Sequence, residues 1–218
     1  MRDDQLIPRD DAELLAAWRE GSREAGGQLL ERHFRSLYLF FVTKVGHGGE
    51  VDDLIQRTFT GAVEGLERYR GEAAVKTWLL AIARNVLRQW AWERKRKRTR
   101  EEGLGEVSVA DLGVGVSTAF RQAREQKLLV AGLQRLPIDA QVILELYYWE
   151  GLRAREIAGV FAIPEGTVRG RIRKAKVLLE AELDALTRTG EELASTLQGL
   201  ETWAADIAAQ VLPSPTAR

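Results

Sequence analysis

The sequence predicts an all-α protein with two small helical domains, one over residues 10–98 and one over residues 123–184. Two observations support this fold class. Apolar residues recur every three or four positions through most of the chain, as on one face of an α-helix, and no segment alternates as a strand does. Between the two domains, residues 99–122 lose this periodicity and are rich in glycine, serine and valine, which predicts a flexible linker.

Four helices are expected in the first domain. The interval 11–44 contains two apolar stripes separated at Gly21-Ser22, so we expect two helices, with Ser22 as the N-cap of the second. A third helix begins near Glu50, after a glycine-rich turn. A fourth begins near Ala74, buries an apolar stripe and runs on into a basic segment.

The second domain is expected to hold four more helices, which begin or end at recognisable breaks. The first ends at Pro137, and the second is short and stops at Gly151. The third covers residues 153–161, and the fourth is a long helix from Glu165 to about Leu186.

A C-terminal extension, residues 185–218, follows the second domain. Its stretch 191–211 carries an apolar stripe that needs a partner. Two interpretations stay open at this point. The stretch packs on the second domain as a structural element, or it docks reversibly on either domain and restrains it.

The composition limits the classes of protein to consider. Basic and acidic residues both number 32, so the formal net charge is zero, but basic residues cluster at 94–100 and 169–176. The chain has no cysteine and only two histidines, His33 and His47, which leaves little for a metal site. We therefore expect no metal, no cofactor and no catalytic residues. We also expect a cytoplasmic protein without a signal peptide or a membrane span.

Residues 151–176 have the features of a helix-turn-helix. Two helices meet across a tight turn at 162–164, with small or apolar residues where they must pack closely. The second helix presents basic side chains on one face, among them Arg169, Arg173 and Lys176. Such a helix fits the major groove of DNA, where arginine pairs with guanine and backbone N–H groups meet phosphate. The sequence therefore indicates a protein that binds double-stranded DNA.

Three segments together are similar to a known family. Residues 136–179, from Leu-Pro through Ile-Pro-x-Gly-Thr-Val-Arg and a basic helix, resemble the −35-reading region 4 of extracytoplasmic-function (ECF) sigma factors. Residues 53–59 resemble the Asp-Leu-x-Gln-acid-x-Phe motif of that family, and residues 69–85 resemble the segment that melts and reads the −10 element. Over residues 10–184, the chain thus resembles an ECF member of the sigma-70 family of RNA polymerase sigma factors.

The resemblance implies a function and partners. The first domain corresponds to sigma region 2 and the second to sigma region 4, and the protein directs promoter-specific initiation by core RNA polymerase. Its implied contacts on the polymerase are the β′ clamp coiled coil and the β flap, and promoter DNA is the other partner. Family members are commonly held inactive by an anti-sigma factor, so such a regulator is also expected.

The resemblance also implies three sets of contact residues. The polymerase-binding residues are Asp52, Asp53, Leu54, Gln56 and Phe59. The residues for the −10 element and its melting are Tyr69, Trp78, Arg84, Asn85, Arg88 and Gln89. The residues for the −35 element are Arg153, Glu165, Thr167, Arg169, Arg171, Arg173 and Lys174. For Trp78 a core position is the alternative, because it lies in the apolar stripe of its helix.

The chain departs from the family pattern at four positions. Arg57 replaces an acid in the polymerase-binding motif, Val75 replaces a phenylalanine, Ala162 replaces a glycine in the turn and Gly170 replaces a serine on the recognition helix. The alternative function is a free-standing helix-turn-helix regulator that does not bind polymerase, and the segments 53–59 and 69–85 argue against it. A nucleic-acid enzyme is disfavoured, because no P-loop or Ser/His/Asp set is present.

Overall fold

The computed structural model describes residues 10–46, 49–98, 108–112 and 124–198. Within these ranges every regular element is a helix, which confirms the all-α prediction, and one isolated bridge pairs Ser108 with Pro137. Among these helices, none combines the length and the apolar composition that crossing a bilayer requires.

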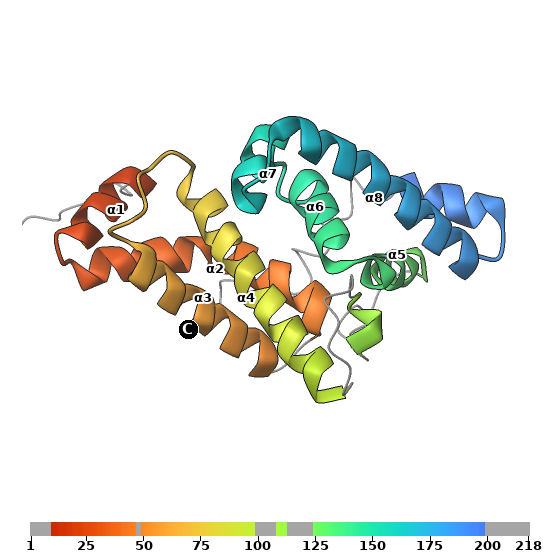
Figure 1. Ribbon diagram of the computed structural model, residues 1–218, viewed down its shortest axis with the longest axis horizontal. Coiled ribbons are helices and arrows are strands. Elements are labelled where there is room, and N and C mark those ends of the chain that lie inside the picture. The colour runs from red at the N-terminus through yellow and green to blue at the C-terminus, as the bar shows by residue number, and fades with distance from the viewer. Residues whose placement is uncertain (1–9, 47–48, 99–107, 113–123, 199–218) are drawn as a thin grey trace, which may run out of the picture.

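The first domain consists of four helices, with boundaries close to those expected. They are α1 (Asp11–Arg19), α2 (Arg23–Val45), α3 (Gly49–Gly65) and α4 (Val75–Arg98) (Figure 1). Ser22 caps α2 as predicted, because its Oγ accepts a hydrogen bond from the Ala25 N–H at 3.2 Å. Gly26 lets α1 lie directly on α2, because a Cβ at this position would come within 2.6 Å of Trp18 Nε1.

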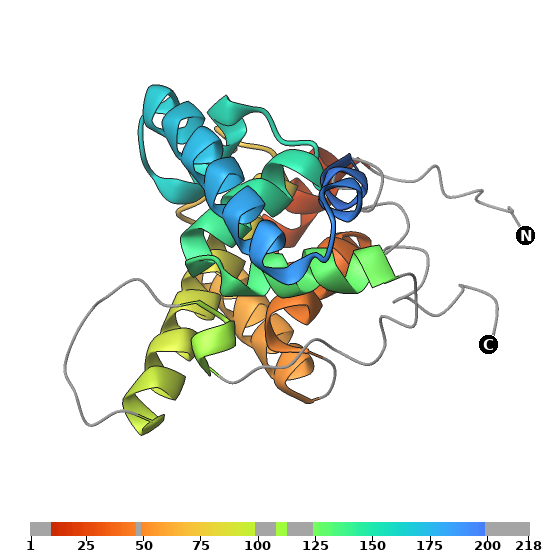
Figure 2. The ribbon, with the colours of Figure 1, turned by 90° about the vertical axis from the view of Figure 1, so that its right-hand side faces the viewer.

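The second domain also contains four helices. They are α5 (Arg124–Arg135), α6 (Ile138–Tyr148), α7 (Ala154–Phe161) and α8 (Glu165–Leu186). The long helix α8 packs against α5, α6 and α7 and forms the centre of this domain. Figure 2 shows α8 in blue, crossing over the shorter helices.

The turn of the helix-turn-helix depends on an alanine in the left-handed conformation. α7 ends at Ala162, with φ 52° and ψ 45°, and the Ile163 N–H donates to the Ala158 carbonyl oxygen at 3.2 Å. Pro164 then precedes the first turn of α8 and has no N–H to leave unpaired. The chain therefore keeps the backbone geometry of a glycine turn with a side chain present, at a conformational cost of about 1–2 kcal/mol.

Part of the predicted flexible linker is instead packed. Residues 108–112 include a short 3-10 helix, and the side chains of Val109 and Leu112 are buried. The Arg94 Nε donates to the Leu112 carbonyl oxygen at 3.2 Å. The two apolar side chains explain the difference, because they join the hydrophobic core and the 3-10 helix contacts α4 and α5, although the surrounding sequence is rich in glycine. The rest of the predicted linker lies outside the described residues.

The two domains pack on each other, which the sequence did not predict. α7 lies against α4, α5 contacts α2, and side chains of α6 form ion pairs with α2 and α4 (Figures 1 and 2). At the centre of this interface, the fully buried Lys44 forms an ion pair with Glu145. Burial raises the pKa of the Glu145 carboxyl and lowers that of the Lys44 amine, and the attraction between the two charges opposes both shifts.

The described part of the C-terminal extension packs on the second domain. Residues 190–198 are helical, and Leu193 and Leu197 lie against the core. Glu192 forms an ion pair with Arg124 of α5. Both interpretations of the extension include such a contact, and the remainder of the stretch 191–211 lies outside the described residues.

The strained turn gives a first prediction. We expect Ala162→Gly to raise the free energy of unfolding by about 0.5–1 kcal/mol, because glycine adopts a positive φ without the Cβ clash but loses more entropy on folding. Urea denaturation followed by circular dichroism measures the change. The control is Ala181→Gly, at an exposed position inside α8, which should lower the free energy of unfolding by about 1 kcal/mol. A loss of stability in both variants would contradict the left-handed conformation at 162.

Candidate nucleic-acid interface

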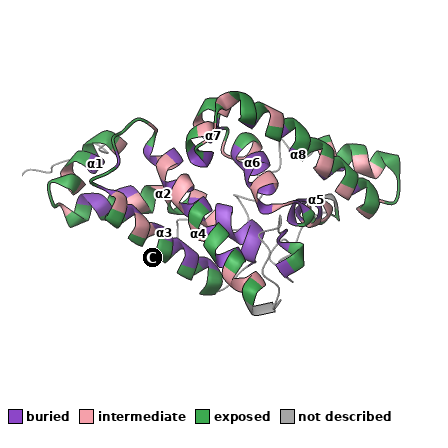
Figure 3. Ribbon diagram, viewed as in Figure 1, coloured by how far each residue is buried: buried purple, intermediate pink, exposed green. Residues whose placement is uncertain are grey.

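Helix α8 exposes a basic face because its apolar residues are used by the core. Val168, Ile172 and Ala175 are buried at helical spacing against the other helices of the domain. The side chains between them therefore point to solvent, and the outer side of α8 is coloured as exposed in Figure 3. The exposed residues from the predicted −35 set are Arg153, Thr167, Arg169, Arg171, Arg173 and Lys174.

Two of the predicted −35 residues interact with each other. The Arg169 guanidinium donates to Glu165 Oε1, at 2.5 Å through Nη2 and 3.2 Å through Nε. Arg153 lies at the N-terminus of α7, where its N–H donates to Glu156 Oε2 at 2.8 Å. The Glu165–Arg169 pair is on the surface, so it orients the guanidinium with little effect on stability.

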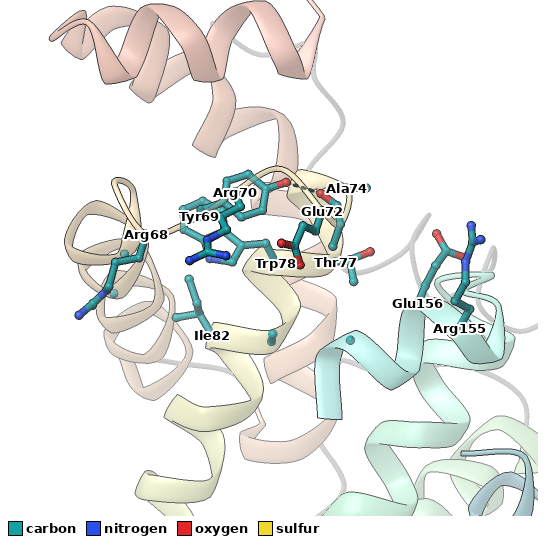
Figure 4. A pocket seen from close by; sticks show the side chains of 15 residues that line it. Arg68, Tyr69, Arg70, Glu72, Ala74, Thr77, Trp78, Ile82, Arg155 and Glu156 are labelled. Atoms are coloured by element: carbon teal, nitrogen blue, oxygen red, sulfur yellow. Dashed lines mark hydrogen bonds between the residues drawn. The ribbon is translucent and has the colours of Figure 1, made fainter. Parts of the chain in front are cut away.

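A cavity of about 1040 Å³ lies beside the loop that joins α3 to α4. Figure 4 shows Tyr69, Arg70, Trp78 and Ile82 on one side of it, and Arg155 and Glu156 of α7 across from them. The side of the cavity formed by the loop and α4 thus contains both aromatic residues that the sequence assigned to the −10 element. Both domains contribute to its lining.

Tyr69 and Trp78 form a stacked pair under the loop. Their ring centroids are 4.4 Å apart and the ring planes differ by 13°. Tyr69 is buried, and its hydroxyl donates to the Ala73 carbonyl oxygen. Burial raises the pKa of the Tyr69 phenol, which favours the protonated form that donates this hydrogen bond. Tyr69 thus fixes the loop through its hydrogen bond to Ala73 and its stacking on Trp78. Trp78 is half-buried and lines the cavity.

Arg19 of α1 holds the same loop from the other side. Its guanidinium donates to the Tyr69 carbonyl oxygen and lies 5.7 Å from the centroid of the Tyr69 ring. The sequence did not indicate this residue, because 50 positions separate the two partners and no periodic pattern connects them. Arg19 is therefore a positioning residue for the loop.

The remaining predicted −10 residues divide into exposed and buried ones. Asn85, Arg88 and Gln89 are exposed on α4, and Gln89 Nε2 donates to Glu93 at 3.0 Å. Arg84 is buried. Its guanidinium donates to both carboxylate oxygens of Asp139 at 2.9 Å and lies 4.0 Å from the centroid of the Phe161 ring.

Helix α3 exposes an acidic face opposite its buried one. Asp52, Asp53 and Gln56 are exposed, whereas Leu54 is fully buried in the core and Phe59 is half-buried against it. This difference follows from the helical periodicity, which places Val51, Leu54, Ile55 and Thr58 on the inner face. Leu54 and Phe59 therefore hold α3 in place, and the three polar residues form the outer surface.

Arg57, which replaces the usual acid of the motif, is engaged by neighbouring carboxylates. Its Nε lies 2.9 Å from Asp53 Oδ2, and its Nη1 lies 3.6 Å from Glu93 of α4. All three side chains are at least one-third exposed, so these pairs contribute little to stability. They do bring a positive charge into the middle of the acidic face.

The basic recognition helix and the loop cavity together define a two-domain helical DNA-binding protein. Two family models match it: Sigma-70 region 2 over residues 29–100 and Sigma-70 region 4 over residues 126–179. The ECF RNA polymerase sigma factor SigM of Mycobacterium tuberculosis is 32% identical over 183 residues, covering 84% of this chain and 88% of that protein. The ECF RNA polymerase sigma-E factor of Haemophilus influenzae is 28% identical over 184 residues, which cover 81% of this chain and 96% of that protein. The chain belongs to the ECF sigma factors of the sigma-70 family.

Solved structures of sigma factors have the same fold. CnrH, solved in complex with the cytosolic domain of CnrY, matches with a TM-score of 0.59 and 25% sequence identity, over 81% of this chain and 99% of CnrH. RpoE of Bartonella quintana, solved with the anti-sigma factor NepR, matches with a TM-score of 0.53 and 19% sequence identity, over 72% of this chain and 96% of RpoE. We refer to the first domain as region 2 and to the second as region 4.

The contact of Arg19 with the loop gives a second prediction. Backbone N–H groups of Arg68 and Tyr69 donate to the Gly65 carbonyl oxygen at 3.0 Å, so their hydrogen exchange reports on loop order. We expect Arg19→Ala to speed this exchange about 5- to 10-fold, the effect of losing a hydrogen bond worth about 1 kcal/mol. Arg23→Ala, an exposed arginine at the start of α2, is the control. Equal exchange rates in both variants would show that Arg19 does not order the loop.

Proposed function

We propose that this sigma factor binds core RNA polymerase through the outer face of α3, reads a −35 element with α8 and opens the −10 element beside the loop cavity. One observation carries the proposal. The acidic face of Asp52, Asp53 and Gln56 belongs to a different domain from the helix-turn-helix, and all three residues are exposed on the side of α3 that faces away from the core. A free-standing regulator needs only the helix-turn-helix, whereas a sigma factor needs both surfaces.

For the −35 element, the support is the exposed basic face of α8. A helix of this length fits the major groove, and its first turn directs backbone N–H groups outward where a phosphate can bind. Arg171, Arg173 and Lys174 follow on the exposed side. Arginine can read guanine through two hydrogen bonds, and both arginine and lysine can contact phosphate.

For the −10 element, the support is the cavity and its aromatic residues. Unstacking a base costs a few kcal/mol, and stacking a base on an aromatic side chain returns about 1–3 kcal/mol, so opening needs no ATP if flipped bases are captured. Trp78 lines the cavity, and Asn85, Arg88 and Gln89 continue along the exposed side of α4. We assign capture of unpaired bases to the cavity and contacts with the adjoining strand to α4.

The proposed partners follow from the same surfaces. The β′ clamp coiled coil is the proposed partner of α3, and the β flap is that of region 4. An anti-sigma factor is a further proposed partner, supported by the similar structure of CnrH in complex with the cytosolic domain of CnrY. Inside a bacterial cell these partners place the protein in the cytoplasm.

The acidic face gives a third prediction, tested by run-off transcription with core RNA polymerase on fragments from upstream of the gene for this protein. We expect initiation that depends on the protein, and we expect Asp53→Ala/Gln56→Ala to reduce it at least tenfold, because two exposed polar contacts are lost. Glu24→Ala/Gln28→Ala removes an acid and a glutamine from the exposed side of α2 and serves as the matched control.

Two measurements in this experiment distinguish an unsuitable promoter fragment from a failure to bind core polymerase. Core binding is measured on the same samples by gel filtration. Core binding without transcripts shows that the fragment lacks the right promoter, and a set of random-sequence templates then replaces it. Absence of core binding by the unaltered protein would reject the sigma mechanism in favour of a free-standing regulator.

The recognition helix gives a fourth prediction. We expect Arg173→Ala to weaken binding of a fluorescent 30-base-pair duplex, because one phosphate contact is lost. The slope of the logarithm of the association constant against the logarithm of the salt concentration, which is negative, should become less steep by about one. Lys127→Ala, an exposed lysine on α5, leaves both quantities unchanged. Fluorescence anisotropy between about 50 and 200 mM salt measures them. If both variants have the slope of the unaltered protein, α8 does not face the DNA backbone at Arg173.

A further inference from the structure

Two charged residues of region 2 connect sites that the proposed function assigns to different partners. Arg57 Nε lies 2.9 Å from Oδ2 of Asp53, a proposed polymerase contact, and Arg57 Nη1 lies 3.6 Å from Oε2 of Glu93. Glu93 Oε1 in turn accepts a hydrogen bond at 3.0 Å from Nε2 of Gln89, a proposed DNA contact. These contacts form a continuous network from the outer face of α3 to the exposed face of α4.

The backbones that carry this network are held at a fixed spacing. α3 packs against α4 (Figure 1), and Gly61 allows a close approach, because a Cβ there would lie 2.9 Å from Cγ2 of Ile82. Toward the other end of the contact, Arg94 Nη1 of α4 pairs with Glu50 Oε1 of α3 at 2.6 Å. The helices are thus joined on both sides of Arg57, and what can change at this surface is the placement of the side chains.

Arg57 carries one positive charge between two carboxylates, so it cannot pair fully with both. In the free chain it lies closer to Asp53 than to Glu93, at 2.9 Å against 3.6 Å. The side chains of Arg57, Asp53 and Glu93 are 44%, 53% and 37% exposed, so each pair is weak and exchanging one pair for the other costs little. A cationic group of a partner that binds Asp53 therefore leaves the guanidinium to Glu93.

Glu93 is an acidic residue among the proposed DNA contacts of α4. It follows Gln89 by one helical turn and accepts a hydrogen bond from its amide. A carboxylate without a cation beside it repels a DNA phosphate, and it also holds the Gln89 amide away from other acceptors. A guanidinium on Glu93 reduces the repulsion and competes with the amide for the carboxylate. The position of Arg57 therefore affects how well α4 binds DNA.

Resting on the proposed function, we propose that Arg57 is a positioning residue that couples polymerase binding on α3 to DNA binding on α4. When a cation of the polymerase takes Asp53, Arg57 turns to Glu93, and α4 presents less negative charge to the promoter. Linkage requires the reverse effect as well, so DNA on α4 strengthens the contact of α3 with polymerase by the same factor. From the usual strength of an exposed ion pair, this factor is about two- to fivefold.

The free full-length chain tests the network without polymerase, because Asp53→Asn removes the charge that a bound partner would neutralise. Glu64→Gln is the control, since it makes the same change of net charge at an exposed position of the same helix. We expect a fluorescent single-stranded DNA oligonucleotide to bind Asp53→Asn about two- to fivefold more tightly than Glu64→Gln, as measured by anisotropy at low salt. In chains that also carry Arg57→Gln, the two changes should give equal affinities, because the guanidinium that transmits the effect is missing.

The Gln89 side chain gives a second readout that does not involve DNA. Nuclear magnetic resonance measures the exchange of its NH2 hydrogens with water. We expect Asp53→Asn to speed this exchange about two- to fivefold, because Arg57 competes for the carboxylate that accepts the hydrogen bond, and Glu64→Gln to leave it unchanged. Backbone amides of α3 and α4 should exchange at the same rate in both variants, which separates this effect from a loss of helix stability.

Complexes with core RNA polymerase test the coupling itself. Arg57→Gln and Arg23→Gln remove the same charge, and Arg23 is exposed at the start of α2. Core polymerase contributes its own DNA contacts equally to both complexes, so these cancel in the comparison. We expect core polymerase to increase the affinity for the oligonucleotide about two- to fivefold more with Arg23→Gln than with Arg57→Gln.

Three results would overturn the proposal. They are equal affinities of Asp53→Asn and Glu64→Gln for the oligonucleotide, a difference between them that persists with Arg57→Gln, and an equal effect of core polymerase on Arg23→Gln and Arg57→Gln. A failure of the unaltered protein to bind core polymerase rejects the proposed function and is recognised in the run-off assay. The measurements on the free chain decide the role of Arg57 in either case.

Discussion

The ion pair between Lys44 and Glu145 takes two charges out of water at the junction of the two regions. Desolvation of a buried pair cancels most of its attraction, so the pair adds little net stability, but either charge alone would be strongly unfavourable there. Its main effect is therefore on geometry: α6 can lie on α2 only where the two charges meet. α7 packs on α4 in the same interface and forms the wall of the cavity opposite Trp78. An interface of this kind is specific without being irreversible.

The surfaces proposed for partners share one origin, which is the part of each helix that the core does not use. On α3 the core takes Leu54 and its neighbours and leaves Asp53 and Gln56 outside. On α8 it takes Val168 and Ile172, and the arginines between them face solvent. A change that rotates either helix would therefore move the core and the contact surface together.

Local signals account for what could be predicted from the sequence. Helical periodicity, the cap at Ser22 and the break at Pro137 each act over a few residues, and the helices follow them closely. The packing of region 4 on region 2 could not be predicted, because Arg84 and Asp139 are 55 positions apart and no periodic pattern connects them. Arg84 therefore looked free for DNA, and Leu54 looked like a contact residue because the motif contains it. A sequence motif identifies the residues of a segment, but it does not show which of their side chains are buried in the folded protein.

The covalent connection between the two regions affects how a separate ligand competes with region 4 for region 2. Residues 99–123 join α4 to α5, and fully extended they span at most about 90 Å. Region 4 is thus confined near region 2 at an effective concentration on the order of 0.5 mM or more, at any dilution of the protein. A separate acidic ligand at micromolar concentration would have to bind Lys44, Lys76 and Arg84 far more tightly than region 4 does to displace it. A partner that held the two regions apart would remove this local excess without contacting the side chains of the interface.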